Sequence, residues 1–405
     1  MSLRTALGLS VAAACAVATL PAVAAPAQPP RPVVAVVGDR GLNVLHEEFR
    51  TRDGSTPRYP AGMPRPVLVD LPRSGDFADR MDALRQGPLG SPRADTLYAV
   101  RGTRLLVYVP PGHDDVLTDR AHGTGVAASV GGARTGSAPD ALVVFVPGGG
   151  EASYDWVADQ RWIDVASTSV YSIPTTEPCA GAKPVRRLHA DGGLLFSSSG
   201  NTTDSAEPLM VPNGLPEVYQ VGGVDRTGRT YAPPHPEEPE PAFAVANVVR
   251  PYETGARFSF PAASGDDLSG SQPFGGTSGA TPTVAGYAAG LITEARRLLG
   301  AAGPRTDASL VSRRAGGPRP PGRGPLADGR FTRDELVRLL HHTAVPAEPG
   351  SPARYALEGY GATTPMSHAR ALAVLRGAAA EPQRPEEDAA HDQVEQLRGR
   401  LTQRC

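Results

Sequence analysis

The sequence lacks three features that would point to particular functions. Acidic and basic residues nearly balance, with a formal net charge of -2, so we expect no nucleic-acid partner. After the first 24 residues, no apolar run reaches the roughly 20 residues needed to cross a bilayer. Cys179 and Cys405, the two cysteines beyond that first segment, have no Cys/His neighbours typical of a metal site or a cysteine protease. After export these two could pair with each other, stay unpaired or link to another chain.

The first 24 residues have the pattern of a signal peptide. Arg4 precedes the apolar run from Thr5 to Leu20, and Ala22-Val23-Ala24 supplies the small residues that a signal peptidase requires. An alternative makes Cys15 a lipoprotein acylation site, but the residues before it form a poor lipobox. We therefore expect a secreted protein that does not contact a membrane once residues 1–24 are removed.

Residues 32–377 alternate between strand and helix patterns, which predicts an α/β domain. The chain is 40% hydrophobic and 20% charged, values that suit a folded soluble protein. Val33–Val37 and Ala141–Val146 are continuous apolar runs, typical of strands buried on both faces of a parallel sheet. Further strands are expected at 104–109, 165–171, 193–196 and 218–221, and helices at 76–86, 154–164 and 331–342. This alternation predicts a doubly wound, mostly parallel sheet with helices on both faces.

Three segments depart from this alternation. Residues 51–119 show little periodicity outside the helix and strand named above, so we interpret them as an insertion. Residues 303–330 are rich in Pro, Gly and Arg and predict a flexible loop. Residues 378–405 are charged and poor in apolar side chains; a helix is compatible with them, but the pattern favours a solvated tail.

Three polar residues follow or precede these elements in a pattern that suggests catalysis. Asp39 comes directly after the strand Val33–Val37, where an Asp is ordinarily a turn residue, but its spacing to His46 and Phe49 favours a catalytic role. His122 opens a helix of small residues, which would pack closely on the sheet and fix the imidazole.

Ser278 is the third of these residues and follows two glycines, Gly275 and Gly276. Apolar residues then recur every three or four positions up to Leu298, and Gly300 would end the helix. Ser278 is therefore expected at a helix amino terminus, where free N–H groups and the helix dipole favour a nearby negative charge. A purely structural role as helix cap is the alternative for this serine taken alone.

The Asp39, His122 and Ser278 stretches, in this chain order, resemble the Asp, His and Ser motifs of the subtilase family of serine peptidases. The most specific match is Gly276-Thr277-Ser278-Gly279-Ala280-Thr281-Pro282. Ser199-Gly200-Asn201 is similar to the segment that carries the family's oxyanion asparagine. Three supporting segments also resemble the family: Val221 to Asp225, Phe260 to Gly265 and Gly359 to Gly361. The resemblance covers roughly Pro32 to Gly377.

The resemblance implies an endopeptidase that forms an acyl-enzyme intermediate on a peptide or protein substrate. Ser278 would be the nucleophile, His122 the base and Asp39 the group that orients the imidazole, while Asn201 and the Ser278 N–H would stabilise the oxyanion. Substrate would bind as an extended strand beside Ala166 to Val170. The resemblance is compatible with a structural calcium ion, because calcium often stabilises family members, but no loop here has convincing ligand spacing; we therefore assign no metal site and expect no cofactor. We expect a monomer.

Several neighbours of these residues differ from the family pattern. Arg40, Gly125, Gly279 and Thr283 stand where the family usually has Ser or Thr, His, Met and His; these changes are expected to affect specificity and rigidity more than the reaction. About seven residues separate Ala24 from the first strand, too few for the amino-terminal folding domain of many secreted subtilases, so we predict folding without one. The insertion 51–119 would overhang the cleft and restrict specificity.

Two other functions are compatible with parts of the pattern. A catalytically weak or inactive subtilase-like peptide-binding protein is opposed by the retention of all four polar groups. An esterase on an α/β-hydrolase fold would require Gly-x-Ser-x-Gly and the chain order Ser, Asp, His, whereas Ser278 comes last and lies in Thr-Ser-Gly.

Overall fold

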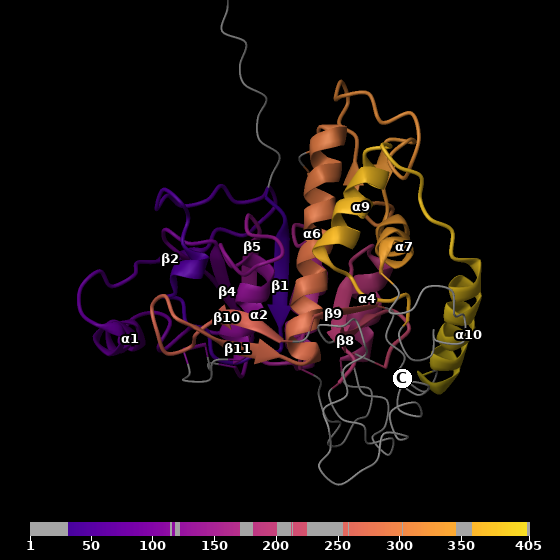
Figure 1. Ribbon diagram of the computed structural model, residues 1–405. Coiled ribbons are helices and arrows are strands. Elements are labelled where there is room, and N and C mark those ends of the chain that lie inside the picture. The colour runs from indigo at the N-terminus through magenta and orange to yellow at the C-terminus, as the bar shows by residue number, and fades with distance from the viewer. Residues whose placement is uncertain are drawn as a thin grey trace, which may run out of the picture.

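A nine-stranded sheet forms the centre of the described part of the chain (Figure 1). The computed structural model describes residues 31–113, 116–117, 122–170, 181–200, 212, 214–224, 254–257, 259–301, 303–345 and 359–402. Every neighbouring pair of strands is parallel except β3 and β4. In sheet order the strands are β2 (Val67–Val69), β3 (Thr96–Val100), β4 (Leu105–Val109), β5 (Leu142–Val146), β1 (Val33–Val37), β6 (Val165–Thr168), β7 (Leu195–Ser198), β8 (Tyr219–Val224) and β9 (Thr254–Arg257).

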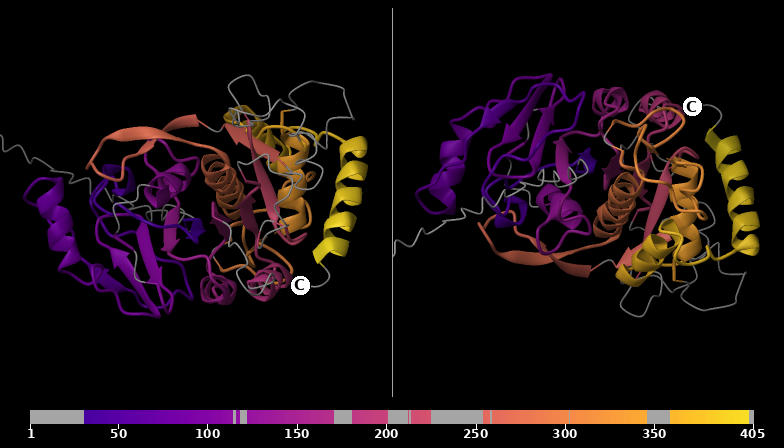
Figure 2. Two further views of the ribbon diagram at one scale, coloured as in Figure 1. Left: turned by 90° about the horizontal axis from the view of Figure 1, so that it is seen from below. Right: turned by 90° about the horizontal axis from the view of Figure 1, so that it is seen from above.

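Both faces of this sheet are buried, which explains the continuous apolar runs in the sequence. Along β1, Val34 and Val36 belong to one hydrophobic core, and Val33, Ala35 and Val37 belong to the other. The first core is covered by α2 (His122–Gly131), α6 (Thr277–Leu299), α7 (Arg333–Thr343) and α9 (Pro365–Leu375), and the second by α3 (Glu151–Asp159) and α4 (Ala182–Ala190). Figure 2 shows helices on the two faces. The predicted doubly wound α/β fold is confirmed.

The expected elements are present, with some boundaries shifted. The strand expected at 193–196 is Leu195–Ser198, and the helix expected at 154–164 is Glu151–Asp159. That helix stops early because the chain leaves helical geometry at Gln160 and buries Trp162 and Ile163 before β6 begins. Among the described residues, no helix combines the length and apolar character needed to cross a membrane.

The described part of residues 51–119 contributes strands to the central sheet, and their interpretation as an insertion stays a prediction. The segment supplies β2, β3 and β4, and β4 pairs directly with β5. It also supplies α1 (Phe77–Arg85), whose expected start is fixed by Asp76, since that side chain accepts a hydrogen bond from the Asp79 N–H at 3.0 Å.

Residues 303–330, which the sequence predicts to be a flexible loop, pack against the domain. Val311–Ser312 form β12, which pairs with β13 (Arg330–Phe331). Leu310 and Leu326 belong to the first core, and Arg305 is fully buried. The Pro and Gly residues therefore shape an irregular but packed connection.

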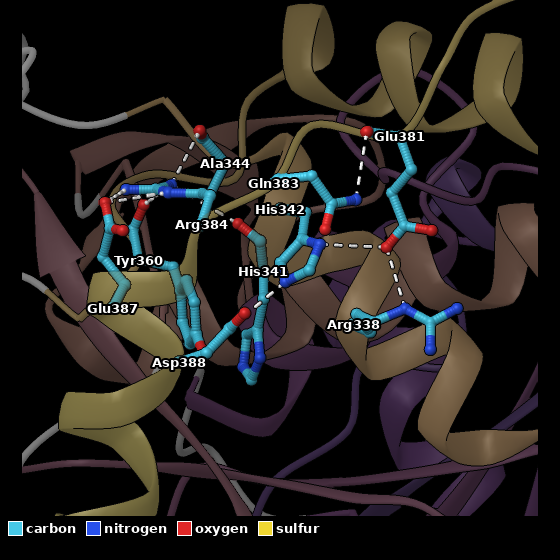
Figure 3. A network of polar contacts seen from close by, with 10 residues as sticks. All are labelled: Arg338, His341, His342, Ala344, Tyr360, Glu381, Gln383, Arg384, Glu387 and Asp388. Atoms are coloured by element: carbon cyan, nitrogen blue, oxygen red, sulfur yellow. Dashed lines mark hydrogen bonds and ion pairs between the residues drawn. The ribbon is translucent and has the colours of Figure 1, made fainter.

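Within the predicted solvated carboxyl-terminal tail, residues 385–402 form the helix α10 (Pro385–Thr402). Ala390 and Val394 of α10 pack against Ala344 and Tyr360. The polar contacts that hold this helix are drawn in Figure 3. Arg384, just before α10, donates to the Tyr360 carbonyl at 2.6 Å and the Ala344 carbonyl at 3.4 Å, and so satisfies carbonyls beyond the end of α7.

The His342 imidazole lies between two carboxylates, one of them on α10. Its Nδ1 lies 2.9 Å from Glu381 Oε1 and its Nε2 lies 3.1 Å from Asp388 Oδ1, which also accepts from the Tyr360 hydroxyl at 2.6 Å. Burial opposes protonation of the imidazole, but the two carboxylates outweigh it and raise the His342 pKa above its ordinary value.

We expect the stabilisation from His342 to be complete below about pH 6.5 and to be lost as pH rises through its raised folded-state pKa. The difference in unfolding free energy between wild type and His342→Gln should therefore be larger near pH 6 than near pH 9, as measured by urea denaturation. Equal differences at the two pH values would show that His342 is not protonated in this network.

Candidate active site

Asp39 lies at the carboxyl end of β1, held by a tight backbone. Gly38 has a φ of +88°, and a Cβ there would lie 3.3 Å from the Gly149 Cα atom and 3.4 Å from Thr168 Oγ1. Both the backbone conformation and these close contacts favour glycine at this position. The Asp39 side chain is buried, and its Oδ1 accepts the Arg40 N–H at 2.8 Å. That bond fixes the carboxylate.

His122 lies at the start of α2, and its two following residues explain the His-Gly-Thr motif. A Cβ at Gly123 would come within 2.7 Å of the Arg40 carbonyl, so glycine allows the helix to approach the Asp39 loop. The Gly123 N–H donates to the same carbonyl at 2.9 Å. Thr124 Oγ1 accepts the Asn43 N–H at 2.8 Å. The motif therefore ties the helix that carries His122 to the loop that carries Asp39.

The His122 imidazole contacts the Asp39 carboxylate directly. Nδ1 lies 2.9 Å from Oδ1 and 3.1 Å from Oδ2, and the His122 side chain is 43% exposed whereas that of Asp39 is 2% exposed. Burial lowers the stability of the imidazolium, but the hydrogen bond and charge of Asp39 outweigh it and raise the His122 pKa. With Nδ1 donating to Asp39, Nε2 is left to accept a proton.

The Phe274 ring packs against the His122 imidazole. The ring lies edge-on to His122, with centroids 5.4 Å apart and an interplanar angle of 68°. Phe274 belongs to β11 (Ser271–Gly275), which pairs with β10 (Ser259–Ala263). A Cβ at Gly125 would lie 2.6 Å from the Phe274 ring. Gly125 is therefore required by the ring that packs against His122.

We expect Gly125→Val to destabilise the fold by about 1–3 kcal/mol, because the added methyl groups overlap the Phe274 ring. Urea denaturation measures the loss. In Gly125→Val/Phe274→Ala the smaller side chain makes room, so part of the stability should return relative to the sum of the single changes. Strict additivity of the two changes would contradict this packing.

Ser278 lies in the first turn of α6. Gly276, at the N-cap, has a φ of +70°, a conformation that favours glycine. Pro282, four residues after Ser278, has no N–H to donate to the Ser278 carbonyl. The Ser169 hydroxyl, just beyond β6, takes that place and donates to the carbonyl at 2.9 Å. The nucleophile candidate is thereby joined to the end of β6.

The Ser278 hydroxyl points toward Ser169 in this structure. Its Oγ donates to the Ser169 carbonyl at 3.4 Å, and no hydrogen bond joins it to His122 within the described residues. A rotation about the Cα–Cβ bond is needed to turn Oγ toward His122. In this first turn the Gly279 N–H donates to the Gly276 carbonyl at 3.1 Å, whereas the Ser278 N–H has no acceptor among the described residues and remains able to bind an oxyanion.

The structure thus brings Asp39 and His122 into contact and places Ser278 at the start of α6. Asn201 lies outside the described residues, and so do Cys179, Cys405 and residues 1–24. His46, noted in the Asp39 stretch, has a structural place: its Nε2 bonds the Gly270 carbonyl at 2.8 Å. Sequence reasoning did not single out Ser169 or Phe274. Ser169 follows a buried strand at its carboxyl end, which is the signal that could have found it.

No group of three or more His, Cys, Asp and Glu side chains in the described ranges could hold a metal ion. The expectation that the protein uses no cofactor stays a prediction.

Comparisons with known proteins point to one family. Residues 33–355 match the model of the Subtilase family, Peptidase_S8. No curated protein matches the chain.

Solved structures also resemble the chain. The prenylagaramide maturation protease PagA is 18% identical with a TM-score of 0.47, over 85% of this chain and 94% of that one. The self-cleaved protease domain of PatA is 17% identical with a TM-score of 0.47, over 86% and 97%. A cold adapted subtilisin-like serine proteinase is 19% identical with a TM-score of 0.42, over 78% and 83%. Because the family model spans most of the sequence, the chain belongs to the subtilase family of serine peptidases, which are hydrolases.

Proposed function

We propose that this protein is a secreted, monomeric serine endopeptidase in which Asp39, His122 and Ser278 form the catalytic triad and Asn201 contributes to the oxyanion hole. The contact between the buried Asp39 carboxylate and the half-exposed His122 imidazole is the observation that carries the proposal. The amino-terminal signal pattern supports secretion.

The geometry supports a separate role for each group in moving the Ser278 proton. Asp39 fixes the tautomer that leaves His122 Nε2 free, so Nε2 takes the proton from Ser278 Oγ as Oγ attacks the carbonyl carbon. Asp39 then stabilises the imidazolium, and His122 returns the proton to the leaving amine. Negative charge on the former carbonyl oxygen is stabilised by the Ser278 N–H and the Asn201 amide.

The end of β6 supports a place for substrate beside the nucleophile. Ser169 is hydrogen-bonded to Ser278, and the next residue, Val170, is 38% exposed. An extended peptide that pairs with the backbone after Thr168 would bring its scissile carbonyl to Ser278. This arrangement favours cleavage within an extended segment.

The acidic limb of the pH–rate profile should lie above the ordinary imidazole pKa. His122 acts as a base only when neutral, and Asp39 raises its pKa, so we expect kcat/KM to fall as pH drops through that raised value. Asp39→Asn should reduce kcat by about 10⁴-fold and move this limb to lower pH. Profiles of wild type and Asp39→Asn test the assignment; a limb that does not move would contradict it.

Peptides blocked at both ends and a p-nitrophenyl ester distinguish this function from its alternatives. Cleavage of internal peptide bonds supports the proposal. Ester hydrolysis without peptide cleavage would instead indicate an esterase, and binding of peptides without turnover of either substrate would indicate a subtilase-like binding protein.

A further inference from the structure

Four arginines line one cavity at the β2 side of the sheet. The cavity has a volume of about 730 Å³, and the four arginines that line it are Arg50, Arg73, Arg80 and Arg101. They come from four separate places: after η1 (Glu47–Phe49), after β2, from α1, and from the turn between β3 and β4. In Figure 1, α1 and β2 lie at the opposite side of the molecule from α10.

The charges in this cavity are not balanced. Asp70 is the one carboxylate that lines it, and Asp70 Oδ1 already binds Arg101 Nε at 3.2 Å. Arg50, Arg73 and Arg80 form no ion pair with any described residue, and Arg80 Nε is buried without a hydrogen-bond partner. Burial and the charge of Arg80 both lower the Arg50 pKa, so these guanidiniums repel one another. An anion between them would remove that repulsion.

The cavity is separate from the candidate active site. β4 is parallel to β5, and Leu105 pairs with Val143 near the start of that strand. The turn that carries Arg101 precedes β4 and therefore lies at the amino-terminal end of the parallel strands. Asp39 follows β1 and therefore lies at the opposite, carboxyl-terminal end of the parallel strands.

We propose that this cavity binds a ligand with two or more phosphoryl groups. Guanidinium groups bind phosphoryl oxygens through paired hydrogen bonds, and three guanidiniums without a carboxylate partner can neutralise more than one phosphate. The volume exceeds what a single phosphate fills. The lining contributes Leu71 and Pro72 as its apolar side chains and no aromatic one, which favours a small polyanion over a peptide anchored by its side chains.

Calorimetric titration of the full chain with inorganic pyrophosphate at constant ionic strength tests the site. We expect saturable 1:1 binding that Arg73→Gln/Arg80→Gln weakens at least ~10-fold, since each change removes charged hydrogen bonds. Arg52→Gln/Arg58→Gln, an equal loss of charge on exposed neighbours outside the cavity, should leave binding unchanged. Arg73→Gln alone, which alters an exposed side chain, gives a second variant that is expected to fold.

A nucleoside diphosphate and vesicles containing phosphatidic acid then distinguish a soluble from a lipid-borne source of phosphoryl groups. Loss of binding in Arg73→Gln/Arg80→Gln but not in Arg52→Gln/Arg58→Gln supports the site for either source. Absence of saturable pyrophosphate binding, or equal weakening by both pairs of changes, would overturn it. Binding of hexaglutamate without binding of pyrophosphate would also overturn it, in favour of an acidic-peptide surface.

Discussion

Ser278→Ala is expected to lower kcat for peptide cleavage by about 10⁴- to 10⁶-fold, because it removes the nucleophile while leaving the rest of the site in place. Ser278 lies in the first turn of α6, and its hydroxyl makes one long hydrogen bond of 3.4 Å to Ser169. Loss of that bond should change stability little. Initial rates of cleavage of a blocked fluorogenic peptide measure the effect.

Ser169→Ala is the matched control for this change. It removes a neighbouring hydroxyl that binds the Ser278 carbonyl but does not attack substrate. We expect a much smaller reduction in kcat than for Ser278→Ala. Residual activity of Ser278→Ala close to that of Ser169→Ala would show that Ser278 is not the nucleophile.

Asp164→Ala is expected to destabilise the fold by about 3–5 kcal/mol, because it leaves a buried arginine without its counter-charge. Asp164 precedes β6 and binds Arg296 near the end of α6 through two hydrogen bonds, of 2.9 and 2.5 Å. The two side chains are 1% and 4% exposed. Asp164 Oδ2 also accepts the Val33 N–H at 2.9 Å, so the change frees a buried donor at the start of β1 as well. Urea denaturation measures the loss.

Asp82→Ala provides the comparison for an exposed pair. Asp82 binds Arg85 at 3.0 Å on α1, and both side chains are about half exposed or more. We expect this change to cost at most about 0.5 kcal/mol. A similar cost for Asp82→Ala and Asp164→Ala would contradict the buried role of the Asp164–Arg296 pair.

The sequence predicted the centre of the fold better than its margins. Val33–Val37 is buried on both faces of the sheet, as its continuous apolar run predicts for an inner strand. β2 is an edge strand with Val67 and Leu68 exposed, and three residues are too few to show a period. The packing of α10 was not predicted for a different reason. It depends on polar contacts of Arg384 and Asp388, which hydrophobic periodicity does not detect.

The candidate site was predictable where the backbone demands a particular residue. Gly123 must be glycine because the Arg40 carbonyl lies close to it, and that requirement is visible in the sequence as His-Gly-Thr. The partnership of Gly125 with Phe274 was not predictable, because it joins residues 149 positions apart through ring packing alone. The same holds for Ser169 and Ser278, whose contact depends on Pro282 having no N–H to donate.

The site of covalent labelling by a fluorophosphonate tests the proposed triad most directly. After reaction with purified protein, peptide mapping by mass spectrometry should find the probe on Ser278, and His122→Ala should slow the labelling by several orders of magnitude, because Nε2 no longer takes the serine proton. Labelling of a different serine, or labelling of Ser278 at the same rate in His122→Ala, would contradict the proposed Asp39–His122–Ser278 triad.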